Sequence, residues 1–149
     1  MPKLKWEIKS LDSDLTFKQA GRKVISKRIK ILESVIEKYL KDETPENLHE
    51  VRIAIRRLRY NMEIFISCFT RRIFLTFYKV VADLQDITGK IRDNDILISN
   101  LNSQNITNSN NAVAKRIEDS NIKLKQELKI SLNDFLRSKD YKDFIKLLK

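Results

Sequence analysis

Apolar side chains recur at three- and four-residue spacing through most of this chain, a pattern typical of amphipathic helices. The spacing predicts helices over about 15–41, 45–69, 73–102, 112–137 and 141–148. Thr44 and Pro45 mark the start of the second helix, because a threonine N-cap followed by proline suits the first helical turn. Arg71-Arg72 is expected to lie in the next turn, and Gly89 to bend the third helix.

Long helices joined by short connections predict an all-α fold. We expect an antiparallel bundle of four long helices plus a short C-terminal helix, which together form a single domain over residues 1–149. The asparagine-rich stretch 102–111 separates a core of about 15–102 from C-terminal helices at 112–148, and its composition predicts a loop. Only two glycines and two prolines occur, which argues against a turn-rich β-sandwich or barrel.

The balance of charges narrows the possible partners. Lysine and arginine total 30 against 20 acidic residues, a formal net charge of +10. This excess raises the on-rate for anionic partners, so nucleic acid, polyphosphate, an acidic membrane face and acidic proteins all have to be considered. No run of about 18 apolar residues is present and the N-terminus does not resemble a signal peptide, so we expect a cytoplasmic protein without a membrane span.

The second predicted helix separates an apolar stripe from a basic ridge. The stripe consists of Val51, Ile55, Leu58, Met62, Phe65 and Phe69, and the ridge of His49, Arg52, Arg56 and Arg59, with Arg57 at its edge. Arginine binds phosphate oxygens bidentately, and successive turns of a helix rise by about 5.4 Å. The ridge could therefore bind a chain of phosphates laid along the helix, although a merely solvated face is the alternative.

A second charged segment follows between Leu84 and Leu97. Lys90 and Arg92 lie close in sequence to Asp93 and Asp95, which favours local charge pairing, and Asp93 could pair with an arginine of the preceding helix. The two aspartates are two residues apart and so point to different faces of a helix. With one histidine and the single Cys68 in the chain, we expect neither a metal site nor a cofactor.

These two segments resemble the signature motifs of CHAD domains, the conserved histidine α-helical domains. Residues 49–59, HEVRIAIRRLR, are similar to the family pattern H-x-x-R-V-x-x-R-R-L-R. Residues 88–95, TGKIRDND, are similar to the family's later L-G-x-x-R-D-x-D. The resemblance extends over roughly residues 17–101.

The resemblance implies an all-helical fold that binds inorganic polyphosphate through basic residues lining a central channel. Carried over by position, the anion contacts would be His49, Arg52, Arg56, Arg57, Arg59 and Arg92, with Lys90 and Arg22 as weaker additions. CHAD domains contain two related helical halves, whereas this chain has one such motif and about half the usual length. The resemblance therefore also implies that two chains associate as a homodimer.

We therefore expect a non-catalytic module that binds polyphosphate or a similar polyanion. A nucleic-acid-binding helical protein is the alternative, with Tyr60 and Asn61 as the nearby candidates for stacking or base-edge contacts. An acidic protein partner also remains open. An enzyme acting on phosphoanhydrides is not expected, because the sequence offers no nucleophile paired with a base.

Overall fold

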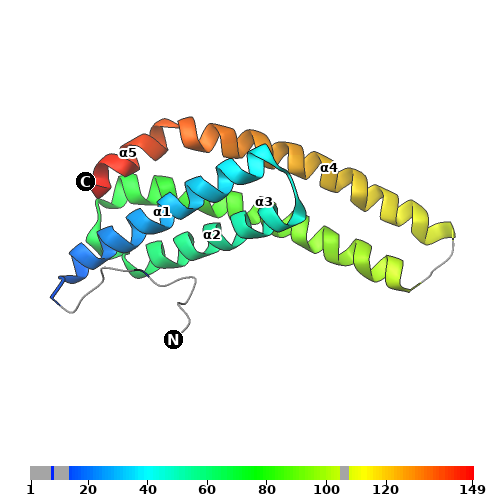
Figure 1. Cartoon of the computed structure of the whole chain (residues 1–149), viewed down its shortest axis with the longest axis horizontal. Coiled ribbons are helices and arrows are strands. Elements are labelled where there is room, and N and C mark those ends of the chain that lie inside the picture. Colours follow the sequence, from blue (N-terminus) through cyan, green and yellow to red (C-terminus); the bar gives the residue numbers. More distant parts are fainter. Residues whose placement is uncertain (1–7, 9–13, 105–107) are drawn as a thin grey trace.

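The computed structural model describes residue 8 and residues 14–104 and 108–149, which form an all-α bundle (Figure 1). Its helices are α1 (Phe17–Lys41), α2 (Pro45–Ile64), the short 3₁₀ helix η1 (Ile66–Cys68), α3 (Arg71–Ser103), α4 (Asn108–Arg137) and α5 (Lys139–Leu148). The predicted fold class, four long helices followed by a short one, is confirmed.

Side-chain caps define where several helices begin. The Thr44 hydroxyl accepts a hydrogen bond from the backbone nitrogen of Asn47, and Pro45 occupies the first turn of α2, as predicted. Thr16 and Gln19 cap α1 reciprocally, each side chain accepting from the other's backbone nitrogen. These caps satisfy amide groups that have no partner within the helix.

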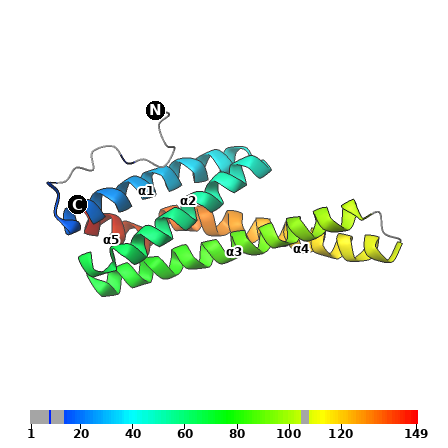
Figure 2. The ribbon, with the colours of Figure 1, turned by 90° about the horizontal axis from the view of Figure 1, so that it is seen from below.

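The helices pack as two antiparallel hairpins. α1 and α2 form the first, α3 and α4 form the longer second, and α5 folds back beside the start of α3 (Figures 1 and 2). α3 and α4 extend past the turn that joins α1 to α2 (Figure 2). We call this extension, residues 92–103 of α3 and 108–120 of α4, the distal arm.

The hydrophobic core lies between the two hairpins and α5. The predicted stripe of α2 points into it: Val51, Ile55, Leu58, Met62 and Phe65 are buried, and Phe69 is half-buried. At the α5 end the core is aromatic, and the rings of Phe77 and Phe144 stack with centroids 4.2 Å apart. The core holds α2 firmly against α3, which positions the polar faces of both helices.

Several helix boundaries differ from the predicted ones. α2 ends at Ile64, and Arg71-Arg72 begins α3 instead of lying in the turn. α3 also continues through Gly89 without interruption.

The asparagine-rich stretch is mostly helical, since α3 reaches Ser103 and α4 begins at Asn108. Of the rest of the predicted loop, Gln104 forms a turn after α3, and residues 105–107 lie outside the described residues. Leu97 and Leu101 lie one turn apart, and such apolar periodicity outweighs the weak preference of asparagine for turns.

Candidate anion-binding trough

α2 and α3 line a hollow that contains part of the predicted basic ridge. Arg52, Arg56 and Tyr60 come from α2, and Lys90 comes from α3 across a volume of about 510 Å³. The remaining lining residues of this hollow are Gln85, Asp86, Gly89 and Asp93. Three cations from two helices thus converge on one opening.

A second hollow of about 300 Å³ adjoins the first at Arg52, which lines both. Here the polar lining residues are His49, Arg52, Thr88, Arg92, Asp95 and Lys125. We call the two hollows together the trough. Five cations (Arg52, Arg56, Lys90, Arg92 and Lys125) and three carboxylates (Asp86, Asp93 and Asp95) line it, together with His49.

The α2 side of the trough follows directly from helical spacing. Arg52 and Arg56 are one turn apart on α2, and both side chains are half-buried. The guanidinium carbon of Arg56 lies over the ring of Tyr60, 5.8 Å from its centroid. Stacking on the ring orients Arg56 at this end of the trough.

At the other end, α4 braces the wall of the trough. Asn121, which is 4 % exposed, donates from Nδ2 to Asp95 Oδ1 at 2.8 Å and accepts from Asn94 Nδ2 at 3.0 Å. These bonds satisfy a buried amide and fix α4 against α3. The hydrogen bond therefore orients the Asp95 carboxylate, which lies in the same hollow as Arg92 and Lys125.

Asp93 does not form the ion pair with an α2 arginine that the sequence allowed. Asp93 shares a hollow with Arg52 and Arg56. However, Asp93 takes part in no ion pair among the described residues, whose ion pairs include Lys38–Glu50, Arg59–Glu63 and Lys129–Glu43. The guanidinium groups of Arg52 and Arg56 therefore keep their charge available within the trough.

Arg59, the last member of the predicted ridge, is held beside the trough and does not line it. Its Nε donates to the Tyr78 hydroxyl at 3.0 Å and lies 3.3 Å from Glu63 Oε1. The hydrogen bond to Tyr78, together with the negative charge of Glu63, raises the pKa of Arg59 above its ordinary value despite some desolvation. Arg59 thus links α2 to α3.

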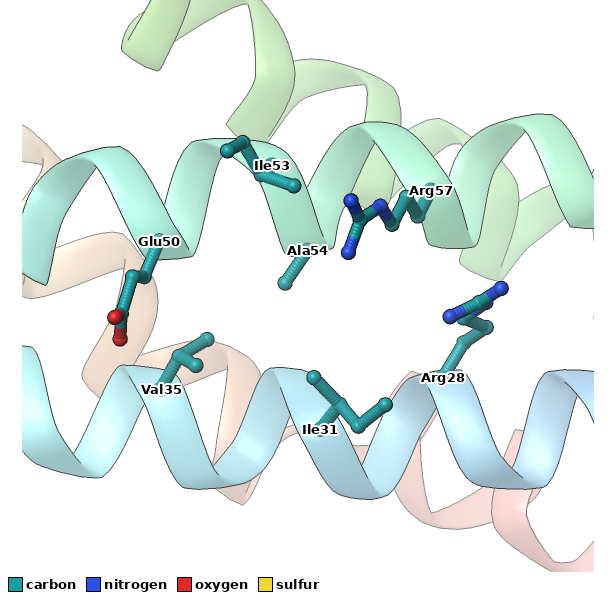
Figure 3. A pocket seen from close by; sticks show the side chains of 7 residues that line it. All are labelled: Arg28, Ile31, Val35, Glu50, Ile53, Ala54 and Arg57. Carbon is teal, nitrogen blue, oxygen red and sulfur yellow. The ribbon is translucent and has the colours of Figure 1, made fainter. Parts of the chain in front are cut away.

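Arg57 belongs to a different groove, between α1 and α2 (Figure 3). It shares a hollow of about 160 Å³ with Arg28, Glu50 and the apolar side chains of Ile31, Val35, Ile53 and Ala54. Burial, with the nearby charge of Arg57, lowers the pKa of Arg28, and Arg28 Nε donates to Asn61 Oδ1 at 2.9 Å. The groove between α1 and α2 is therefore a separate feature from the trough.

Arg22 lies on α1, and it lines neither hollow of the trough. It is half-buried, and its Nε is a buried nitrogen without a hydrogen-bond partner among the described residues. The structure therefore brings together His49, Arg52, Arg56, Lys90 and Arg92 of the predicted contacts, and places Arg22, Arg57 and Arg59 elsewhere.

Comparison with known families identifies the part of the chain that contains the α2 and α3 motifs. The model of the CHAD domain matches residues 3–102, about two thirds of the chain. The chain belongs to the CHAD domain family. No curated protein and no solved structure shows significant similarity to it.

The CHAD match includes both motifs that face the trough, one on α2 and one on α3. CHAD domains are associated in general with polyphosphate binding. α4 and α5 lie beyond the matched residues, yet α4 supplies Lys125 to the trough and Asn121 to its wall. Sequence reasoning missed Lys125, because only the packing of α4 on α3 brings it within reach of Arg92.

Metal-binding clusters and membrane-spanning helices are two further features to consider in this CHAD chain. Among residues 8, 14–104 and 108–149, no group of three or more His, Cys, Asp or Glu side chains is placed to hold a metal ion. No helix in the same part of the chain is both long enough and apolar enough to cross a membrane.

Proposed function

We propose that this CHAD domain binds polyphosphate, or a similar phosphate-rich polyanion, in the trough between α2 and α3. The observation that carries the proposal is the position of Arg52, which lines both hollows and joins the cations of one to those of the other. A linear polyanion is the ligand that can use cations spaced along a continuous track. Guanidinium groups suit it because they bind phosphate oxygens bidentately.

Partial burial strengthens such contacts. Arg52 and Arg56 are half-buried, so their interactions with phosphate are screened less by solvent than those of fully exposed side chains. The three carboxylates of the trough oppose binding of small anions, which cannot reach enough cations to offset that repulsion. A polymer that spans both hollows meets five cations, so length favours binding.

The double variant Arg52→Ala/Arg56→Ala tests the site. We expect its affinity for long-chain polyphosphate to fall at least tenfold, equivalent to about 1.4 kcal/mol, in a titration at fixed ionic strength. The matched control is Arg71→Ala/Arg72→Ala, which removes the same charge from two exposed positions at the start of α3. Equal affinity of the two double variants would overturn the assignment of the trough.

Salt dependence gives a second readout of the same variants. Binding a polyanion releases its counterions, so the logarithm of the affinity should fall linearly with the logarithm of salt concentration. Because the slope reflects the number of phosphates neutralised, Arg52→Ala/Arg56→Ala should have a shallower slope than the parent. An unchanged slope would mean that neither arginine contacts phosphate.

We infer that binding is not accompanied by catalysis, because the trough offers cations and carboxylates but no nucleophile paired with a base. Incubation with polyphosphate and Mg²⁺ or Mn²⁺ should release no phosphate above the background of the metal alone. Sustained release that Arg52→Ala/Arg56→Ala abolishes would overturn this inference.

Single-stranded nucleic acid is the second candidate. Tyr60 lines the trough with 47 % of its surface exposed, and an exposed aromatic ring can stack on a base. Because the Tyr60 ring also orients Arg56, Tyr60→Leu should weaken binding of both ligands, but it should weaken binding of single-stranded DNA more than binding of polyphosphate. If the parent prefers DNA to polyphosphate at equal phosphate concentration, nucleic acid becomes the better assignment.

A further inference from the structure

The distal arm consists of two helices, and no other described helix packs over them (Figure 2). The last buried residue of α3 is Ile91, and the first described buried residue of α4 is Asn121. Among the described side chains beyond these two positions, none is buried, although several are large and apolar. Two helices alone cannot enclose a core, so the arm is incomplete as a packing unit.

Four apolar side chains of the arm form two pairs, one on each helix. Leu97 and Leu101 are one turn apart on α3, and Val113 and Ile117 are one turn apart on α4. The bonds from Asn121 to residues 94 and 95 indicate an antiparallel register in which Leu97 is level with residues 118–119 and Leu101 with residues 114–115, so Ile117 and Val113 lie within about half a turn of them. Leu97 is 48 % exposed and Val113 is 46 % exposed, so this face is open to a partner.

The charge distribution indicates which partner can approach the arm. Residues 92–120 hold three cations and four carboxylates, a formal charge of −1, whereas the whole chain carries +10. The rest of the chain therefore carries +11 and repels a second copy. The arm is the part of the molecule where two copies can meet with little repulsion.

The charges around Ile117 on α4 are arranged so that two antiparallel copies of the helix would be complementary. Two cations, Lys115 and Arg116, precede Ile117, and two carboxylates, Glu118 and Asp119, follow it. If two copies of α4 cross antiparallel at Ile117, each pair of cations comes level with the partner's pair of carboxylates. A surface whose charges match their own reversed order suits a two-fold symmetric contact.

We propose that the distal arms of two copies pair about a two-fold axis, with Leu97, Leu101, Val113 and Ile117 at the contact. Two hairpins joined in this way form a four-helix unit, which can bury the apolar face that a single hairpin leaves exposed. The proposal goes beyond the proposed function, because the four contact side chains line neither hollow of the trough, although the arm begins at Arg92, which does. It also names a surface for the homodimer that the single motif implies.

Light scattering at several protein concentrations tests the proposal without any ligand. The parent should have the mass of two chains, and Leu97→Glu and Val113→Glu should each have the mass of one. Ile130→Glu is the matched control, since Ile130 is 63 % exposed on α4 outside the arm. A monomeric parent at all concentrations, or a dimer that survives both arm variants, would overturn the proposal.

A charge-exchange experiment tests the symmetry of the contact. Lys115→Glu/Arg116→Glu makes the four charges around Ile117 negative, and Glu118→Lys/Asp119→Lys makes all four positive. Each variant alone should be a monomer, and an equimolar mixture should form heterodimers. Circular dichroism verifies that each variant is still helical. If two helical variants fail to associate when mixed, the antiparallel crossing at Ile117 is excluded.

Discussion

Tyr78 accepts a hydrogen bond from Arg59 Nε at 3.0 Å and donates its own hydroxyl proton to Glu63 Oε1 at 2.6 Å. Arg59 and Glu63 lie one turn apart on α2, and Tyr78 lies on α3. The tyrosine therefore joins the two helices that form the trough. Arg59 acts here as part of a clamp between helices.

Tyr78→Phe should separate this structural role from anion binding. The variant keeps the ring and loses both hydrogen bonds, so we expect the free energy of unfolding to fall by about 1 kcal/mol. Affinity for polyphosphate should change less than twofold. Urea unfolding and a binding titration measure the two effects, and a loss of affinity as large as that of Arg52→Ala/Arg56→Ala would place Arg59 in the binding site.

The two glycines of the chain should respond oppositely to alanine. A Cβ at Gly21 would lie 2.8 Å from Cδ1 of Phe65, whose ring packs against Phe17, so Gly21→Ala should cost about 1–3 kcal/mol of unfolding free energy. A Cβ at Gly89 would have no atom within 4 Å, so Gly89→Ala should add about 0.5–1 kcal/mol by removing helix-interior glycine. Thermal or urea unfolding of both variants checks the difference in sign.

Glu33 should make stability depend on pH. Burial, assisted by the charge of Glu37 and opposed by Lys30, raises the pKa of Glu33 above its ordinary value. A carboxyl whose pKa is raised on folding contributes stability at low pH that is lost as the pH rises through its folded pKa. At neutral pH the charged Glu33 therefore opposes folding.

Glu33→Gln should consequently melt at a higher temperature than the parent at pH 7. The difference should disappear near pH 3, below the ordinary glutamate pKa of about 4.3. Glu127→Gln removes one exposed carboxylate from α4 and controls for the change in net charge. A gain at pH 7 that persists at pH 3, or that Glu127→Gln reproduces, would contradict the role of the raised pKa.

The sequence predicted the local features of the fold because they depend on neighbouring residues. Apolar spacing identified the stripe of α2, and Thr44 with Pro45 identified the start of that helix. The boundary at Arg71-Arg72 was wrong and the asparagine-rich loop was predicted too long, because residue preferences for turns are weak beside helix periodicity and packing. Boundaries of this kind depend on contacts with other helices.

The same distinction applies to the candidate site. Arg52, Arg56, Lys90 and Arg92 follow from two motifs, and the structure brings them together. Arg57 and Arg59 belong to the same motif but are positioned by α1 and by Tyr78, respectively. Helical spacing places a residue on a face, and only the packing of other helices decides whether that face is open.

Arg52 stands where the two hollows of the trough meet. If polyphosphate binds there as proposed, a short oligophosphate would fill one hollow and leave the other to water. A longer chain would pass Arg52 and occupy both. The number of occupied hollows would then depend on chain length and would rise from one to two once the polymer is long enough to pass Arg52.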